Sequence, residues 1–221
     1  MTHHLPSQAA PTLLIGSTGP LGRALLTEAA ETDVPIRAFA RNPAALSSLS
    51  IDAVRGDVRD RDSLTAALEG ISQVICVLGS RPGKNDTHLL EEGTRNLLAA
   101  MGDAGAPRLI VVTGMGAGSS RGHGPFWYDA LVRPTILRGV YADKEAQERL
   151  VMASELNWTI VRPAVLSEKP HMRTVIAKGE LAPREKMGAL TRDDVARFLL
   201  SELAEPEFTR QIAHVYTEKT R

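Results

Sequence analysis

The segment PTLLIGSTGPLG, residues 11–22, combines a short apolar run with three closely spaced glycines, and it constrains the fold more than any other feature. The apolar run predicts a buried strand, and the residues from about Gly19 to Ala30 have the periodicity of a helix. A glycine turn between a strand and a helix N-terminus brings backbone amides close to an anion. The spacing is GxxGxxG instead of the commoner GxGxxG, so a purely structural turn is the alternative. With the strand before it and the helix after it, the motif favours dinucleotide binding.

Short β-branched runs alternate with helical periodicities along the rest of the chain. Further strands are predicted at 35–41, 51–57, 72–79, 107–114, 158–163 and 211–217. Asp60, Asn85 or Asp86, Asp143 and Thr191 are predicted to cap the helices between them. This alternation requires right-handed crossovers and a parallel sheet covered on both faces. The predicted fold is a Rossmann-type doubly wound α/β domain of residues 12–221, preceded by a flexible tail of residues 1–11.

The amino-acid composition limits the classes of partner that this protein is expected to bind. A chain of 221 residues with 43% hydrophobic residues is expected to form one domain. Because 26 Lys and Arg balance 26 Asp and Glu, we expect no nucleic-acid partner and no attraction to an anionic membrane. No segment approaches the roughly 18 apolar residues of a membrane span. The single cysteine, Cys76, lies in an apolar run, which fits a reducing cytoplasm. We expect a monomer or homodimer, and no metal site at His3 and His4.

The residue after the second predicted strand distinguishes the two nicotinamide coenzymes. An acidic residue there would hold the ribose hydroxyl of NAD, but the stretch FARNP has Arg41 at this place. A guanidinium matches a 2′-phosphate in charge and geometry. A hydrogen bond to a charged group contributes about 1.5 to 3 kcal/mol, a roughly ten- to hundredfold preference for NADPH. The alternative is a solvated arginine. Asp57 and Val58 at the end of the third strand, and Leu78 and Gly79 at the end of the fourth, are placed to contact the coenzyme or to form turns.

Taken in order, the stretches GSTGPLG, FARNP, GDV, EEGTRNLLAAM, LIVVTGMGAG, SELNWTIVRPAVLS and LTRDDVARFLL resemble the atypical short-chain dehydrogenase/reductase family. The similarity is to its NAD(P)H-binding or NmrA-like branch, with the layout of the biliverdin-IXβ reductase and flavin reductase type, and it extends from about residue 12 to 217. The resemblance implies coenzyme contacts at Gly16, Ser17, Thr18, Gly19, Pro20, Leu21, Arg41, Asp57, Val58, Leu78, Gly79, Thr113, Pro163, Ala164 and Val165.

The sequence departs from this family where the chemistry would occur. Gly114 stands where the flavin reductase type has a serine, and Val165 where it has a histidine. Tyr141 is followed by a lysine three residues later, Lys144, instead of four as in the YxxxK signature. Residues three and four apart both share a helix face, so the spacing alone does not prevent cooperation. The predicted helix begins at Asp143, which would place Tyr141 before it.

Three functions remain open from the sequence. The first is an NADPH-dependent reductase of a flavin, quinone or related acceptor, whose π system delocalises the added charge so that a strong acid is not essential. The second is a coenzyme-binding sensor without turnover, and the third a non-redox or internally redox-balanced enzyme on the same scaffold.

Candidate catalytic residues are Thr113, Tyr141 and Lys144. Tyr128, together with Arg121 and His123, belongs to a segment of about residues 115–141 that is expected to line a substrate site. The aromatic side chain of Tyr128 caps the pocket or anchors that segment, and the two basic residues either close on a bound anion or are solvated. His171, beyond the sixth strand, faces the site or lies on the surface.

Overall fold

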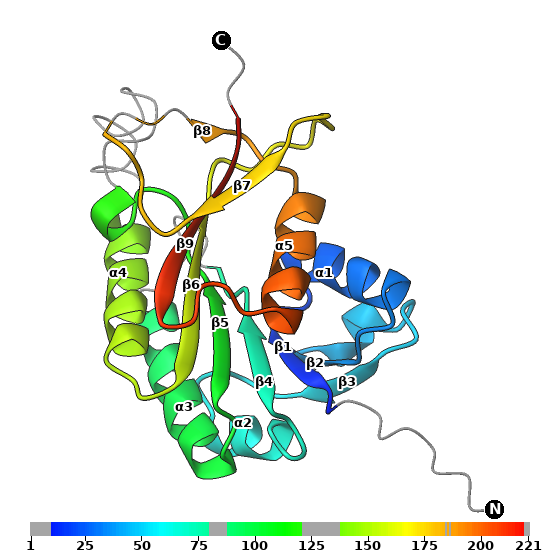
Figure 1. Ribbon diagram of the computed structural model, residues 1–221. Helices are drawn as coiled ribbons and strands as arrows, with labels where there is room; N and C mark the ends of the chain where they lie inside the picture. The colour runs from blue at the N-terminus through cyan, green and yellow to red at the C-terminus, as the bar shows by residue number, and fades with distance from the viewer. Residues whose placement is uncertain (1–9, 80–87, 121–137, 184, 186, 219–221) are drawn as a thin grey trace, which may run out of the picture.

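The structure is a computed structural model, and it describes residues 10–79, 88–120, 138–183, 185 and 187–218. Within these ranges the chain forms one mostly parallel sheet with helices on both sides (Figure 1). The strands are β1 Thr12–Ile15, β2 Ile36–Ala40, β3 Asp52–Arg55, β4 Gln73–Cys76, β5 Arg108–Val112, β6 Asn157–Pro163, β7 Val175–Lys178, β8 Met187–Gly188 and β9 Gln211–Glu218. The α-helices are α1 Pro20–Glu31, α2 Arg61–Ala67, α3 Leu89–Ala104, α4 Arg138–Met152 and α5 Arg192–Ala204, with short 3₁₀ turns η1 Pro43–Leu46 and η2 Gly118–Ser120.

The strand order is β3-β2-β1-β4-β5-β6-β9-β7. The chain moves outward from β1 to β3 in one direction and then from β4 onward in the other. The order therefore reverses between β1 and β4. In open α/β sheets ligands bind beyond the carboxyl ends of the strands at such a reversal. The predicted Rossmann-type fold is confirmed.

Two apolar clusters sandwich the sheet. One lies between the sheet and the helices α1 and α5, which pack on each other, and contains Leu25 and Leu199. The other lies beneath α2, α3 and α4 and contains Leu64 and Leu97. Each helix buries one face against the sheet, as the periodicity predicts. Helices thus cover both faces of the sheet, and the carboxyl ends of the parallel strands all lie at one end of the sheet (Figure 1).

The sheet differs from the prediction at one side. We expected a parallel sheet, but β7 and β8 run antiparallel to β9, and neither strand is predicted from the sequence. Both are short, four and two residues, so they carry too little alternation to be recognised. They extend the sheet beyond β6 and β9.

Two helix starts also differ. Thr191 caps α5 as predicted, in a capping box with Asp194. However, α3 begins at Leu89 after His88, and the predicted caps Asn85 and Asp86 lie outside the described residues. The helix predicted from Asp143 includes residues from Arg138 onward, so Asp143 is an interior residue of α4 and not its cap.

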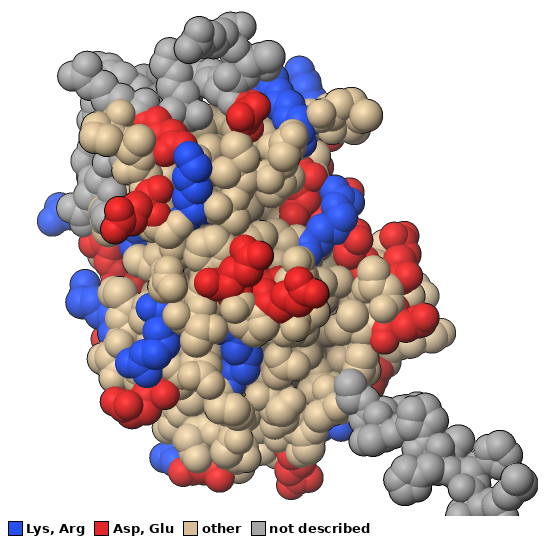
Figure 2. Space-filling view, in the orientation of Figure 1, with Lys and Arg blue, Asp and Glu red and all other residues tan. Residues whose placement is uncertain are grey.

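The surface agrees with the balanced charge of the sequence. On the face in Figure 2, acidic and basic side chains of the described residues are interspersed. None of the described helices is both long and apolar enough to cross a membrane.

Candidate coenzyme and substrate site

The predicted phosphate loop, Gly16 to Gly22, turns sharply between β1 and α1. Gly16 has φ +87°, and a Cβ atom there would lie 2.9 Å from the carbonyl carbon of Val77. A Cβ atom on Gly22 would lie 2.3 Å from the carbonyl oxygen of Gly16. Because both neighbours are backbone atoms, neither position accepts a side chain. The glycines thus allow the close contacts among β1, α1 and the segment after β4 that the prediction requires.

Side chains around this loop hold it to the second strand. Ser17 is buried, and its hydroxyl donates to the carbonyl oxygen of Phe39 at 3.0 Å. Arg23 on α1 donates to the carbonyl oxygens of Thr18 and Ala45, at 3.3 and 2.8 Å. Ser17 therefore has a structural role for its hydroxyl, which sequence reasoning did not anticipate. Thr18 and Pro20 are exposed on the loop, where Gly19 and Leu21 are partly buried.

Arg41 follows β2 directly and is exposed. Unlike the neighbouring Arg37, it has no hydrogen-bond or ion-pair partner among the described residues. Arg37 pairs with Asp52 at 2.7 Å and donates to the carbonyl oxygens of Ala67 and Glu69, at and just beyond the end of α2. Arg37 is therefore a structural residue, while the guanidinium of Arg41 remains available to an anion.

The residues predicted after β3 and β4 meet at the N-terminal half of α3. A Cβ atom on Gly93 would lie 2.8 Å from Cγ2 of Val58 and 3.7 Å from Cδ2 of Leu78. Gly93 is thus required for α3 to approach Val58. Asp57 accepts from the amide of Arg59 at 3.0 Å in a turn, and Gly79 is exposed at the end of the described segment.

Tyr141 and Lys144 both face the segment that follows β5. The hydroxyl of Tyr141 donates to the carbonyl oxygen of Met115 at 2.7 Å, and Nζ of Lys144 donates to that of Thr113 at 2.6 Å. The ammonium lies 5.6 Å from the centre of the Tyr141 ring. Tyr141 is inside α4, not before it, so the two side chains share one face of the helix. Burial lowers the pKa of Lys144 from its ordinary value, and the charge of Glu148 opposes this shift.

A buried polar network lies directly beneath this pair. Thr113 donates its hydroxyl proton to Glu148 at 2.7 Å. The same carboxylate receives two bonds from Arg162 on β6, at 2.9 and 2.7 Å. Glu148 and Arg162 are each 2% exposed, so they form a buried ion pair. Neither residue was predicted, because a Glu on a charged helix and an Arg in a strand carry no local sign of pairing.

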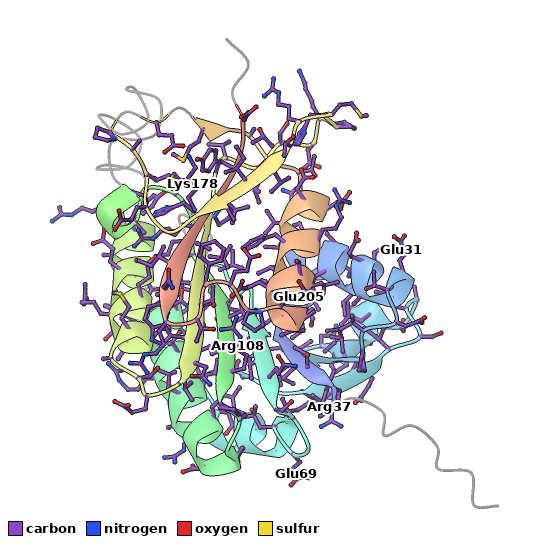
Figure 3. All side chains as sticks on the ribbon, in the orientation of Figure 1. Glu31, Arg37, Glu69, Arg108, Lys178 and Glu205 are labelled. Atoms are coloured by element: carbon purple, nitrogen blue, oxygen red, sulfur yellow. The ribbon has the colours of Figure 1, made fainter. Side chains whose placement is uncertain are left out.

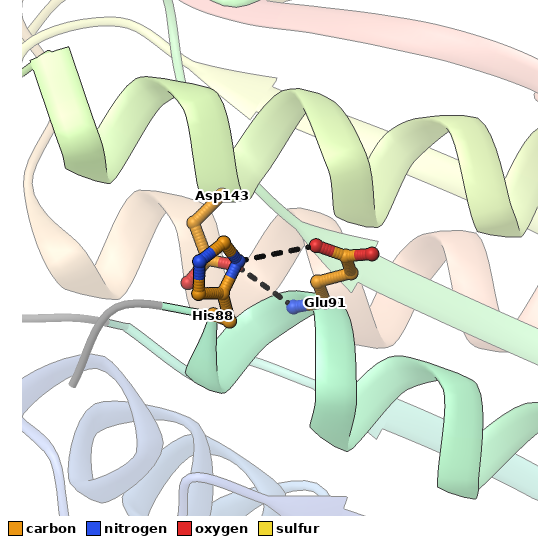
Figure 4. A group of neighbouring side chains, drawn as sticks. All are labelled: His88, Glu91 and Asp143. Carbon is orange, nitrogen blue, oxygen red and sulfur yellow. Dashed lines mark hydrogen bonds and ion pairs between the residues drawn. The ribbon is translucent and has the colours of Figure 1, made fainter.

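A second polar group joins α3 to α4 (Figure 4). Asp143 is buried, and its carboxylate accepts from the amides of Leu90 and Glu91, each at 2.9 Å. It therefore caps α3 from a neighbouring helix. His88 and Glu91 lie close enough to complete a three-ligand group with Asp143. The positive N-terminus of α3 faces this carboxylate, which disfavours a cation there.

The last residue of β6 and the segment that follows it also lie at the carboxyl ends of the strands. Pro163 and Ala164 are buried, whereas Val165 is 60% exposed. Beyond it a pocket of about 550 Å³ lies among α1, α5 and residues 167–171, and it reaches Pro20 of the phosphate loop. His171 lines this pocket, with Nε2 3.0 Å from Oδ2 of Asp194, and is not a surface histidine. Burial raises the pKa of Asp194, but the hydrogen bonds from Thr191 and Arg197 outweigh it and lower the pKa overall.

The predicted site residues that the structure describes thus lie near the carboxyl ends of the parallel strands from β1 to β6. The structure brings Thr113, Tyr141 and Lys144 together at the end of β5. Tyr128, Arg121, His123 and most of the predicted substrate-lining segment lie outside the described residues.

The fold and this edge together define a nicotinamide-coenzyme-binding protein of the Rossmann type. The chain belongs to the NAD(P)H-binding family, whose family model matches residues 16–206. The family resemblance predicted from the sequence is therefore confirmed.

Relatives of this family include enzymes and proteins without an assigned activity. The chain is 30% identical to "Uncharacterized sugar epimerase YhfK" of Bacillus subtilis over 200 residues, 87% of each chain. It is 23% identical to the NAD(P)H azoreductase of Xenophilus azovorans, covering 90% of this chain and 65% of that protein. ChuY, an anaerobillin reductase from Escherichia coli O157:H7, has a similar structure, with a TM-score of 0.78, 22% identity and coverage of 96% and 98%.

Proposed function

We propose that this protein is an NADPH-dependent reductase that delivers hydride to a conjugated acceptor such as a flavin, a quinone or an azo compound. When bound, the coenzyme supplies the hydride, and the protein supplies its binding and orientation. The phosphate loop at the N-terminus of α1 is proposed to hold the pyrophosphate. The exposed Arg41, which has no partner among the described residues, is proposed to bind the 2′-phosphate.

The choice of acceptor rests on the hydrogen bonds that the hydroxyl groups of Tyr141 and Thr113 donate near the end of β5. Tyr141 donates to the carbonyl oxygen of Met115, and Thr113 donates to Glu148. Each proton is therefore directed to a protein acceptor and away from a substrate. Reduction of an isolated carbonyl needs a positioned acid, whose contribution is typically a factor of about 10² to 10⁴. A conjugated acceptor spreads the new charge over its π system and takes its proton from water.

Lys144 has a positioning role in this proposal. Its ammonium is fixed by the carbonyl oxygen of Thr113, at the carboxyl end of the central strand β5. We propose that it donates there to hydroxyl groups of the coenzyme ribose, since an ammonium carries three donors. The exposed apolar surface of Val165, two residues beyond the end of the adjacent strand β6, suits contact with a flat ring. The activities named for the azoreductase and the anaerobillin reductase support an acceptor with an extended π system.

Turnover is tested by following the loss of NADPH absorbance with FMN, menadione or an azo dye as the acceptor. We expect sustained oxidation of NADPH, and we expect Tyr141→Phe to keep kcat within about threefold because its proton is not used. A fall of about hundredfold or more in that variant would identify Tyr141 as the acid and reject the mechanism. Tight NADPH binding without turnover on any acceptor would favour the sensor instead.

A second candidate is an internally redox-balanced isomerisation of a sugar, favoured by the name of the relative that is 30% identical, an uncharacterized sugar epimerase. In that reaction the coenzyme is reduced and reoxidised in one cycle, so no net NADPH is consumed. This reaction also requires an acid-base group that transfers a hydroxyl proton, so the activity of Tyr141→Phe would be strongly reduced. The same variant and the same absorbance assay therefore separate the two functions.

A further inference from the structure

We propose that Arg55 is a second cation of the 2′-phosphate site and acts together with Arg41 to select NADPH. This inference rests on the proposed use of NADPH. It adds a specificity-determining residue from β3, a strand to which no phosphate contact has been assigned above.

The strand register places the two arginines side by side. In the parallel pairing of β2 and β3, Ala40 is the partner of Arg55. The amide of Gly56 donates to the carbonyl oxygen of Ala40 at 3.1 Å, so the pairing continues to the ends of both strands. Arg41 is the next residue after Ala40. With strands about 4.8 Å apart and a rise of about 3.3 Å per residue, the Cα atoms of Arg41 and Arg55 lie about 6 Å apart.

The two sides of the sheet show which way Arg55 points. Alternate strand residues share a face, and Ala53 packs against the cluster that contains Leu46 of η1. Arg55 therefore lies on the face that η1 covers. Arg23 approaches η1 from α1, where it donates to the carbonyl oxygen of Ala45 at 2.8 Å. Arg41 lies two residues before η1, with Asn42 between them. Phe39 belongs to the opposite cluster, so the same alternation along β2 directs Arg41 toward the other face, and the two side chains flank the carboxyl ends of β2 and β3 from opposite sides.

The positive charge of this group is not neutralised locally. Arg41 and Arg55 are exposed, and neither has a partner among the described residues. Arg23 bonds only to carbonyl oxygens there, which leave its charge in place. By contrast Arg37 and Arg59, on the same part of the sheet, are paired with Asp52 and Glu92.

One acidic side chain is close in sequence to this group. The carboxylate of Asp57 is two residues beyond Arg55 and accepts from the amide of Arg59. A single carboxylate does not balance three guanidinium groups. The remaining charge suits a phosphate monoester, which carries about −1.5 to −2 at neutral pH and offers three acceptor oxygens. Planar guanidinium groups from two directions satisfy these oxygens better than one does.

The test uses the folded full-length protein and two nucleotides that differ only in the phosphate. Calorimetric titration compares 2′,5′-ADP with 5′-AMP for the wild type, Arg41→Ala, Arg55→Ala and Arg149→Ala. Arg149 is a matched control, because it is an exposed arginine on α4 without a partner among the described residues. We expect Arg55→Ala to weaken 2′,5′-ADP about tenfold, to leave 5′-AMP unchanged, and Arg149→Ala to change neither.

The outcomes separate this inference from the proposed function. If Arg41→Ala weakens 2′,5′-ADP but Arg55→Ala does not, the role of Arg55 is rejected and NADPH use stands. Equal weakening of both nucleotides by Arg55→Ala also rejects it, because the effect is then not on the 2′-phosphate. If the wild type binds the two nucleotides equally, the preference for NADPH itself is wrong.

Discussion

Glu148 is the residue on which the polar contacts at the ends of β5 and β6 converge. One of its oxygens accepts from both Thr113 and Arg162, and the other accepts a second bond from Arg162. With this carboxylate held in one orientation, the backbone at Thr113 is fixed, and the carbonyl oxygen there in turn holds Lys144. A charge buried far from solvent thus orders the face on which we propose the coenzyme ribose to bind.

Glu148→Gln is expected to lower the free energy of unfolding by about 3 to 5 kcal/mol, because it removes the negative charge that faces the buried Arg162. Urea unfolding measures the change. Glu155→Gln, at an exposed glutamate, is the control and should shift the stability by no more than about 0.5 kcal/mol. A loss as small as that of the control would show that the ion pair does not stabilise the fold.

The lowered pKa of Lys144 predicts that the free energy of unfolding depends on pH with a definite sign. Burial holds its pKa below the ordinary value of 10.5 in the folded protein. Between the lowered pKa and 10.5 the unfolded chain keeps a proton that the folded protein has released, so stability from this group rises with pH. The unfolding free energy of the wild type minus that of Lys144→Met should therefore increase from neutral pH toward pH 10.5. A difference that is flat or decreases would contradict the assignment.

At the scale of elements, the site depends on close contacts between backbones. The phosphate loop brings Gly22 of α1 against Gly16, and α3 brings Gly93 against Val58. Asp143 of α4 caps α3, so these two helices are joined by a charged contact as well as by packing. A side chain at either close contact would separate the elements that frame the proposed coenzyme site.

Gly22→Ala is expected to destabilise the protein and abolish NADPH binding, because its Cβ atom would overlap the carbonyl oxygen of Gly16. Gly102→Ala is the matched control within a helix. Gly102 is exposed on α3, with no atom within 4 Å of the added Cβ, so alanine there should raise stability by about 0.5 to 1 kcal/mol. Thermal unfolding and NADPH titration measure both effects. Retention of full affinity in Gly22→Ala would show that the loop does not bind the pyrophosphate.

At the scale of the whole molecule, the candidate residues lie at the carboxyl ends of the strands, and a buried ion pair joins a helix to the sheet at the amino ends. Arg108, labelled in Figure 3, is the first residue of β5 and forms a buried ion pair with Glu202 of α5 at 2.8 Å. Thr159 also donates to this carboxylate at 2.9 Å. This group fastens α5 to the sheet on the side away from the phosphate loop.

Coenzyme binding should stabilise the whole fold. A ligand that binds only the folded state at a hundredfold excess over its Kd adds about 2.7 kcal/mol to the free energy of unfolding. We expect NADPH to raise Tm more than NADH at equal concentration, and Arg41→Ala to remove most of that difference. Equal shifts by the two coenzymes in the wild type would contradict the proposed preference.

The order of the parallel strands and the α-helices, and the glycine turn between β1 and α1, were predicted correctly because their signals are local. An apolar run, helical periodicity and a glycine turn each involve residues within one or two turns of chain. Thr191 was identified as a cap for the same reason, since its partner Asp194 is three residues away. The short strands β7 and β8 were missed because their pairing with β9 involves residues about 30 positions or more away.

The sequence by itself thus determined that this chain is a parallel α/β fold with a glycine loop after its first strand and an arginine after its second. Tertiary structure alone decided which polar side chains meet. Asp143 has the local appearance of a cap for its own helix, yet it caps α3, 53 positions away. The partners of Tyr141 and Lys144 lie 26 and 31 positions away, on the segment after β5. Hydrogen bonds and ion pairs act over a few ångströms in space, so contacts between distant segments exist only once the sheet and helices have packed.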